Sequence, residues 1–451
     1  MLFRSRDDIE WIIHNLLKRI FSRGIKLLVS KGKKAIMDQE KNNANGKAHR
    51  PIVYIKRTII LVLLLSLVYF MYTKIVAHNK KEETLKAAAE MKKQEELKKK
   101  EEKKKQEVQK QKQKEQEEQM KQAQAAEKPA EGPPQEINEN AQLDQYLQNA
   151  GFSGTAVIVK NGKVLLNKGY GMANKEQQVP NNSETTFYIG SISKAFVATA
   201  IMQLKDQNKL QVEDTVAKYI PDFPQGNNIQ LKHLLTHTSG IPEYEQGKED
   251  ISHEELIKRI GNQKRIGGPG EKWKYSDSNY SILAYIAEKV SGQSLEEYIK
   301  QHIFATAGMK HSGFGTALEQ TRFPSTGYKI VNNNMTTPNI PSMSQLYGCG
   351  DIYTSAHDLY LFNEALYSGK LISKESYDQM FTGGKKDYGF GWYVDPGSYS
   401  NHGVMPGWNC LNGFSKNGSV YVVLLSNIQN NIKSFGKVNN DIYSILRNIE
   451  V

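Results

Sequence analysis

The sequence contains only two cysteines, Cys349 and Cys410, in 451 residues. Neither belongs to a CxxC pair or to a Cys/His cluster with metal-ligand spacing, so the sequence predicts no metal site and no cofactor. We interpret both as small, buried apolar residues. A disulfide between them stays open as the alternative, because an exported domain would permit one.

Excess basic charge is missing from most of the chain, although the formal net charge is +12. Residues 1–140 carry 31 Lys and Arg against 20 Asp and Glu, whereas residues 141–451 carry 29 against 28. A nucleic-acid-binding domain would carry a basic patch on its folded part, so we expect no nucleic-acid partner. A basic N-terminal segment suits a chain that lies beside anionic lipid.

One long hydrophobic run interrupts this polar N-terminal region. It reads TIILVLLLSLVYFMY from Thr58 to Tyr72 and resumes after Lys74. About 18–20 apolar residues span a bilayer, so residues 58–77 are predicted to form a single transmembrane anchor. Basic residues precede the run, which predicts a cytoplasmic segment at residues 1–57 and an exported C-terminal part. No small-residue cleavage site or lipobox cysteine follows, so we expect the anchor to be retained.

Two appendages flank the predicted anchor. Apolar residues at helical spacing over residues 9–21 predict a basic amphipathic helix on the membrane surface, unless translation starts at Met37. Residues 78–138 form a stalk and linker rich in Lys, Glu and Gln, without a heptad. The stalk itself, residues 79–126, is either a solvated helix, roughly 70 Å long at 1.5 Å per residue, or a disordered spacer.

From residue 139 onward the composition is that of a globular domain. A hairpin around the Asn161-Gly162 turn comes first, followed by a helix-rich middle over residues 191–373. Strand patterns return over residues 388–427, and an amphipathic helix over residues 435–449 closes the chain. We therefore predict an α/β fold of the α+β type, with one antiparallel sheet, terminal helices against it and a helical subdomain opposite.

The first candidate for catalysis is Ser191, followed by Lys194 one helical turn later. Residues i and i+3 share a helix face, so Lys194 can reach the Ser191 hydroxyl and take its proton. An extended segment precedes Ser191 and an amphipathic helix follows, which places the serine where free N–H groups can stabilise an oxyanion. The simpler alternative is an ordinary N-cap serine.

The second candidate is the triplet Tyr275-Ser276-Asp277, on a loop before a strongly patterned helix. The Tyr275 hydroxyl could relay protons, and Asp277 could accept a hydrogen bond from the lysine. The third candidate is the segment Asn401-His402-Gly403-Val404, where a strand beside the nucleophile could bind substrate through its main chain. Taken singly, the triplet also fits plain loop and cap residues, and the third segment fits a loop-to-strand junction.

Together and in this order, these motifs resemble those of the penicillin-binding and class C β-lactamase superfamily: SxxK, Tyr-x-Asn and [Lys/His]-x-Gly. The segments LLTHTSGIPEY at 234–244 and GCGDIYTSAHDL at 348–359 support the resemblance, which covers residues 140–450. It implies a β-lactamase/penicillin-binding transpeptidase-like fold. It also implies that Ser191 is the nucleophile, Lys194 its base partner and Tyr275 the proton relay.

The same resemblance implies an oxyanion hole formed by the N–H groups of Ser191 and Val404, and a structural role for His237. Two positions depart from the pattern. Asp277 replaces the usual Asn, which favours a charged Lys194 and makes either Tyr275 or a coupled Lys194 and Asp277 pair the base. The Tyr-Ser-Asp form is similar to that of the teichoic-acid D-alanine esterases of Gram-positive envelopes.

The second departure lies in the third motif. Asn401 occupies the usual Lys or His position, and strand alternation turns His402 away if Asn401 points inward. A cation for a substrate carboxylate is therefore missing there. Esters of D-alanine with teichoic acid present an ammonium and no carboxylate, whereas β-lactams and D-Ala-D-Ala peptides carry a carboxylate.

We therefore predict a serine hydrolase of the cell envelope that acts on D-alanyl bonds, with esters of teichoic acid as its leading candidate substrate and with its catalytic domain outside the membrane. The alternatives are a DD-carboxypeptidase or endopeptidase on peptidoglycan stems with weak β-lactamase activity, an esterase on small lipidic esters, and a non-catalytic scaffold that binds wall polymer. The expected partners are wall polymer and membrane lipid.

Overall fold

In this computed structural model the described residues are 134–450, together with residues 18, 19, 22, 23, 26, 30, 60, 63, 64, 66–78, 81, 82, 85, 86, 90–94, 96 and 100. The chain divides into two compact units, Met1–Glu131 and Gly132–Val451. We describe each unit by itself.

The described residues of the first unit are helical. Within the predicted anchor at 58–77, residues 60, 63, 64 and 66–77 are described, and their large apolar side chains are mostly solvent-exposed. No helix in the part of the chain that the structure describes is both long and apolar enough to cross a membrane. The predicted helix at 9–21, apart from residues 18 and 19, and much of the predicted stalk lie outside the described residues.

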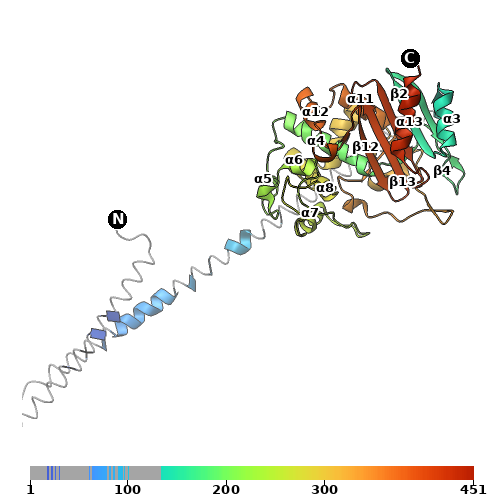
Figure 1. Ribbon diagram of the computed structural model, residues 1–451. Coiled ribbons are helices and arrows are strands. Elements are labelled where there is room, and N and C mark those ends of the chain that lie inside the picture. The colour runs from blue at the N-terminus through green and yellow to red at the C-terminus, as the bar shows by residue number, and fades with distance from the viewer. Residues whose placement is uncertain are drawn as a thin grey trace, which may run out of the picture. The chain divides into compact units, whose positions relative to one another are not determined.

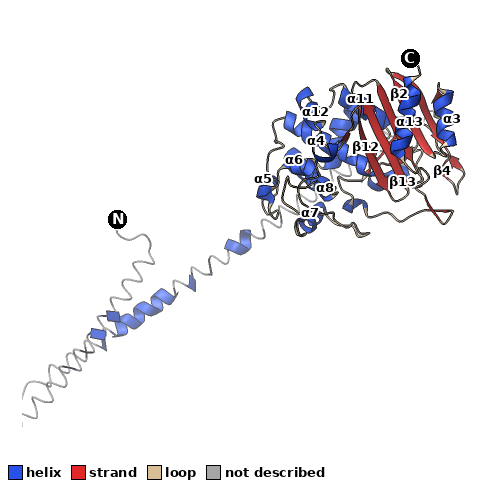
Figure 2. Ribbon diagram, viewed as in Figure 1, coloured by secondary structure: helices blue, strands red, loops and turns tan. Residues whose placement is uncertain are grey.

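A seven-stranded antiparallel sheet forms the centre of the second unit (Figures 1 and 2). Its order is β1-β3-β2-β14-β13-β12-β11, so strands from both ends of the domain lie side by side. In the β2–β3 hairpin, Asn161 and Gly162 adopt positive φ angles of 48° and 79°, as a two-residue turn requires. The strands of this sheet are β1 (Ile137–Asn138), β2 (Gly154–Lys160), β3 (Lys163–Tyr170), β11 (Tyr393–Val394), β12 (Ser398–Met405), β13 (Trp408–Ser415) and β14 (Val420–Ser426).

Helices cover both faces of the sheet. The terminal helices α3 (Ala141–Asn149) and α13 (Phe435–Arg447) pack on one face, where Val422 of β14 belongs to their apolar cluster. The next residue, Val423, faces the opposite cluster with α4 (Ser193–Asp206) and α11 (Ala356–Tyr367), because successive strand residues point to opposite faces. The predicted antiparallel sheet with terminal helices on one side is confirmed.

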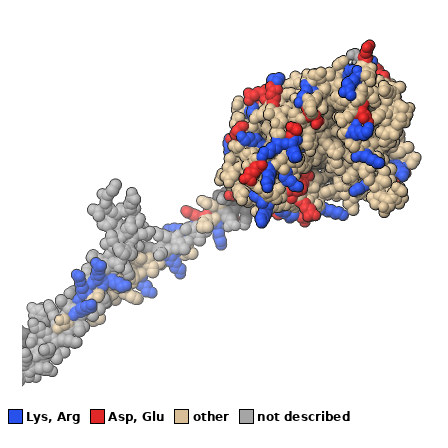
Figure 3. Space-filling model, in the orientation of Figure 1, with Lys and Arg blue, Asp and Glu red and all other residues tan. Residues whose placement is uncertain are grey.

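The middle of the domain is helical, as predicted, and three small sheets lie in and just before it. The middle and following helices are α5 (Val216–Tyr219), α6 (Leu231–Leu235), α7 (His253–Gly261), α8 (Ser278–Ser291), α9 (Leu295–Ile299), α10 (Ala305–Ala307) and α12 (Lys374–Met380). The small sheets pair β4 (Met172–Asn174) with β5 (Val179–Pro180), β8 (Lys329–Val331) with β9 (Asn334–Thr336), and β10 (Ile352–Ser355) with both β6 (Thr186–Tyr188) and β7 (Gly313–Phe314). Acidic and basic side chains are interspersed on the face of the domain in Figure 3, in keeping with its near-neutral charge.

The segment 388–394 departs from the strand pattern expected of it. Only Tyr393–Val394 forms a strand, β11. Gly391 has a φ of 81°, and a Cβ there would lie 3.1 Å from the Ala195 Cα. The main chain therefore turns against α4, and the apolar residues of this segment are buried by that packing rather than by strand alternation.

Candidate active site

Ser191 lies in a 3₁₀ turn, Gly190–Ile192, that leads directly into α4. Gly190 has a φ of 50°, a conformation that residues with a Cβ rarely adopt. The serine is partly exposed, whereas most of α4 behind it is buried. The predicted position of Ser191 at a helix N-terminus is thus the observed one.

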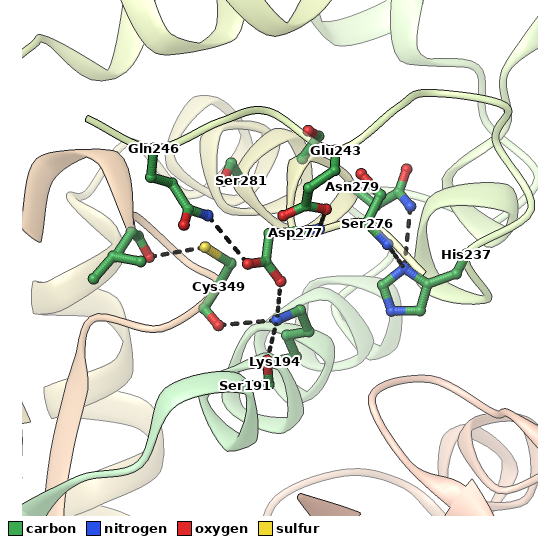
Figure 4. Close-up of polar contacts among 12 residues, drawn as sticks. Ser191, Lys194, His237, Glu243, Gln246, Ser276, Asp277, Asn279, Ser281 and Cys349 are labelled. Carbon is green, nitrogen blue, oxygen red and sulfur yellow. Dashed lines mark hydrogen bonds and ion pairs between the residues drawn. The ribbon is translucent and has the colours of Figure 1, made fainter. Parts of the chain in front are cut away.

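Lys194 points back at Ser191 from the first turn of α4. Its Nζ lies 2.9 Å from the Ser191 Oγ, 3.0 Å from the carbonyl oxygen of Cys349 and 2.7 Å from the Asp277 Oδ1 (Figure 4). Lys194 therefore makes two hydrogen bonds and one ion pair at its Nζ.

Lys194 and Asp277 form a buried ion pair. The Lys194 side chain has no exposed surface, and 22% of the Asp277 side chain is exposed. Burial is the largest single influence on the pKa of Lys194 and lowers it, but the charge of Asp277 and smaller contributions from its other neighbours together raise that pKa well above its usual value. Burial likewise opposes ionisation of Asp277, yet the charge of Lys194 and the hydrogen bonds that Asp277 makes together hold its pKa below the usual value. In the resting site the lysine is therefore charged.

Two side chains from the loop after α6 hold Asp277 in place. Gln246 Nε2 donates to Asp277 Oδ2 at 3.1 Å, and the Asp277 main-chain N–H donates to Glu243 Oε2 at 2.6 Å. In Figure 4 both side chains lie on the side of Asp277 that faces away from Ser191. Burial and then the charge of Asp277 raise the pKa of Glu243 to about 7.

The Tyr275 ring lies between Lys194 and His237. Lys194 Nζ is 5.0 Å from the centroid of the Tyr275 ring, and the His237 ring centroid is 4.3 Å from it. Burial raises the pKa of Tyr275, so the phenol is neutral near pH 7. The Nδ1 of His237 lies 3.3 Å from the Ser276 main-chain N–H and 3.1 Å from Asn279 Nδ2, and burial lowers its pKa to about 3. His237 is therefore a neutral residue that supports the Tyr275 loop.

Strand β12 brings the third motif against the Ser191 turn. A Cβ on Gly403 would fall 1.8 Å from the Ile189 carbonyl oxygen, and one on Gly190 would fall 2.7 Å from the Val404 carbonyl oxygen. Two glycines thus permit a main-chain approach that no side chain would allow. This contact places the Val404 main chain beside Ser191.

The side chains of β12 alternate as expected. Asn401 is buried and its Nδ2 lies 3.5 Å from the Gly391 carbonyl oxygen, while no partner within the described residues reaches its Oδ1. His402 is exposed, and its Nε2 lies 2.6 Å from Asn409 Oδ1. The His402 ring is therefore directed to the next strand rather than to Ser191.

A pocket of about 240 Å³ opens over Ser191. Within the described part of the chain, no Lys or Arg lines it. The Tyr388 ring stands perpendicular to both Tyr275 and Tyr393, with centroids 6.4 and 5.0 Å away. The lining residues are Ser191, Tyr275, Tyr388, Gly391, Tyr393, Asn401, His402 and Val404.

Four side chains around the Lys194 and Asp277 pair and the pocket were not singled out from the sequence: Glu243, Gln246, Tyr388 and Tyr393. Glu243 belongs to the LLTHTSGIPEY segment, which suggested the family without pointing to a role for the glutamate. The two tyrosines lie in the segment interpreted as a strand. Both cysteines, in contrast, are free and buried, as expected.

The family model for Beta-lactamase matches residues 140–446. The chain belongs to the β-lactamase family. This family assignment and the hydrolases among its relatives make it a serine hydrolase.

Relatives within the β-lactamase family include the Putative penicillin-binding protein PbpX of Bacillus subtilis (strain 168), which is 53% identical over 311 residues, or 69% of this chain and 79% of that protein. The Teichoic acid D-alanine hydrolase of Staphylococcus aureus (strain MRSA252) is 31% identical over 301 residues, or 64% and 74%. The crystal structure of FmtA from Staphylococcus aureus superposes with a TM-score of 0.65 at 26% identity, over 70% of this chain and 93% of that one.

Proposed function

We propose that this β-lactamase-family protein hydrolyses D-alanyl esters of teichoic acid through an acyl-enzyme on Ser191. The similarity to the staphylococcal Teichoic acid D-alanine hydrolase supports this substrate class. The chemistry of the pocket supports the ester over the peptide.

The observation that carries the proposal is the absence of Lys and Arg from the pocket lining in the described part of the chain. A substrate carboxylate would need a cation to replace its water on binding. The ammonium of a D-alanyl ester instead meets the tyrosine rings that line the pocket. Aromatic faces attract ammonium groups.

Acylation starts from the Lys194 and Asp277 ion pair. Lys194 passes a proton to Asp277, and the neutral amine takes the Ser191 proton while Oγ attacks the ester carbonyl carbon. When the bond to the teichoic-acid oxygen breaks, Tyr275 gives that oxygen a proton and recovers one from Lys194.

Deacylation reverses these roles. Water attacks the D-alanyl ester of Ser191 and loses a proton to Lys194. As the bond to Oγ breaks, Lys194 gives that proton to Oγ, and Asp277 then returns its proton to Lys194, which restores the ion pair. D-alanine leaves as the free amino acid. The N–H groups of Ser191 and Val404 stabilise the oxyanion in both halves of the reaction.

We further propose that residues 58–77 hold the chain in the cytoplasmic membrane with the catalytic unit outside. The uncharged run over residues 58–72 and the basic residues before it support this location. Protease added to intact cells should then digest residues 134–451. Their protection until the cells are lysed would contradict the proposal.

The deciding experiment measures free D-alanine released from D-alanylated teichoic acid by the full chain, with Ser191→Ala as control. A D-Ala-D-Ala-terminated peptide is tested in parallel. Release of D-alanine from teichoic acid that requires Ser191 would support the D-alanyl ester as the substrate. Release of D-alanine from the peptide alone would overturn this proposal.

A DD-peptidase is the second candidate, because 53% identity relates the chain to a protein named as a penicillin-binding protein. The uncharged pocket counts against it. A scaffold that only binds wall polymer would release D-alanine from neither substrate. The close contacts of Lys194 with Ser191 and Asp277 count against that alternative.

A further inference from the structure

Glu243 links the buried ion pair to the solvent. It accepts a hydrogen bond from the Asp277 main-chain N–H at 2.6 Å, which places its carboxyl group beside that of Asp277. Asp277 in turn contacts Lys194, which contacts Ser191. The Lys194 side chain is completely buried, whereas Glu243 is exposed, so this row of titratable groups starts at the nucleophile and ends at water (Figure 4).

Two carboxyl groups in contact do not both ionise readily, and one of them holds a proton at a pH where an isolated carboxyl would not. The positive charge of Lys194 keeps Asp277 ionised, so the proton belongs to Glu243. The titratable groups that face Glu243 are Asp277 before α8, Lys194 on α4 and Cys349 before β10. Although Glu243 as a whole residue is exposed, its carboxyl group is partly desolvated where it meets Asp277. This desolvation and the Asp277 charge raise the pKa of Glu243 to about 7, and Lys194 opposes that rise.

We propose that Glu243 is a positioning residue that decides whether the proton between Lys194 and Asp277 rests on the amine or on the carboxylate. While Glu243 is protonated, it donates to the Asp277 carboxylate and stabilises the anion, so the proton stays on Lys194. When Glu243 ionises, its negative charge lies nearer to Asp277 than to Lys194. It therefore raises the proton affinity of Asp277 more, and the proton moves to Asp277.

The consequence is a base that responds to pH. Only the neutral Lys194 amine can take the Ser191 proton, so the reactivity of Ser191 should rise as Glu243 ionises. For a single ionisation near pH 7, the rate should increase about tenfold between pH 6 and pH 8.

Glu243→Gln separates this role from a structural one. The glutamine amide can accept from the Asp277 N–H and donate to the Asp277 carboxylate, as protonated Glu243 does, but it cannot ionise. Glu245→Gln is the matched control, because Glu245 is exposed on the same loop, two residues further on. Glu243→Asp keeps a carboxyl that titrates.

The experiment measures the rate at which a fluorophosphonate labels Ser191 in the full chain from pH 5.5 to 8.5, by mass spectrometry. The Oγ–P bond forms, the P–F bond breaks with loss of fluoride, and the Ser191 proton passes to the base. The inference rests on the proposed nucleophile Ser191 but not on the natural substrate, so this reagent tests it independently of teichoic acid.

The labelling rate of Ser191 should increase between pH 6 and pH 8 in the wild type, in Glu245→Gln and in Glu243→Asp. Glu243→Gln should label slowly, with less than about a twofold change over the range. A Glu243→Gln profile that coincides with the wild type would overturn the inference, as would loss of the rise in Glu243→Asp. Absence of labelling in the wild type at every pH would instead refute the proposed nucleophile.

Discussion

The Nζ of Lys194 lies 2.7 Å from the Oδ1 of Asp277, and the lysine side chain is entirely buried. A Tyr-x-Asn motif would place a neutral amide at this position. In this chain the pair is ionic, so the charge on Lys194 has to move before the lysine can act as a base. The same pair also contributes to folding.

Loss of one member of this ion pair should destabilise the protein. Lys194→Met leaves the Asp277 carboxylate without its cation, and breaking a buried pair costs about 3–5 kcal/mol. The double variant Lys194→Met with Asp277→Asn should regain part of that free energy of unfolding, since no uncompensated charge remains. Urea unfolding of both variants measures this difference; a double variant that is no more stable than the single one would contradict it.

The contact between β12 and the Ser191 turn should tolerate no side chain at Gly403. Alanine there would place a Cβ 1.8 Å from the Ile189 carbonyl oxygen, so the strand has to move away from Ser191. A displacement of about 1 Å can cost about a hundredfold in kcat/KM. Gly397→Ala is the control, because nothing lies within 4 Å of a Cβ at that position. Equal rates of Ser191 labelling in the two variants would show that the contact does not position Val404.

The protein should become less stable as the pH decreases, because His237 is buried in its neutral form. Its pKa is about 3 in the folded protein against an ordinary value near 6.5, so the unfolded chain binds the proton first. The free energy of unfolding should therefore decrease by up to about 1.4 kcal/mol per pH unit as the pH falls below 6.5. In His237→Asn the amide oxygen can replace Nδ1 as acceptor, and asparagine suits the φ of 54°. Unfolding curves from pH 6.5 to 4.5 should be flatter for that variant, and parallel slopes would refute the prediction.

A basic side chain in place of Asn401 should change which substrate the enzyme prefers. Asn401 lines the pocket with Ser191, and lysine at this position would offer a charge to a substrate carboxylate. A charge-assisted hydrogen bond contributes about 1.5–3 kcal/mol, so Asn401→Lys should acylate with benzylpenicillin at least about tenfold faster. Release of D-alanine from teichoic acid should fall, because the lysine repels the substrate ammonium. An unchanged ratio of the two rates would mean that Asn401 does not select the substrate.

Much of the fold follows from local sequence patterns. The Asn161-Gly162 turn, the short apolar run of β14 and the amphipathic pattern of α13 each depend on residues within about one element, so each could be predicted. The segment that holds Trp392 was interpreted as a strand for the same reason. It packs against α4 instead, and that distant contact is not encoded in its own pattern.

The sequence alone determined that Ser191 and Lys194 meet, because residues three positions apart on a helix share a face. It also determined, through the three motifs, which residue types would surround them. Only the tertiary structure decided that Gly403 brings β12 onto the Ser191 turn, that Glu243 contacts Asp277, and that Tyr388 and Tyr393 line an uncharged pocket. These contacts join segments that are distant in the chain, so their distances and the resulting charge states depend on how the whole domain packs.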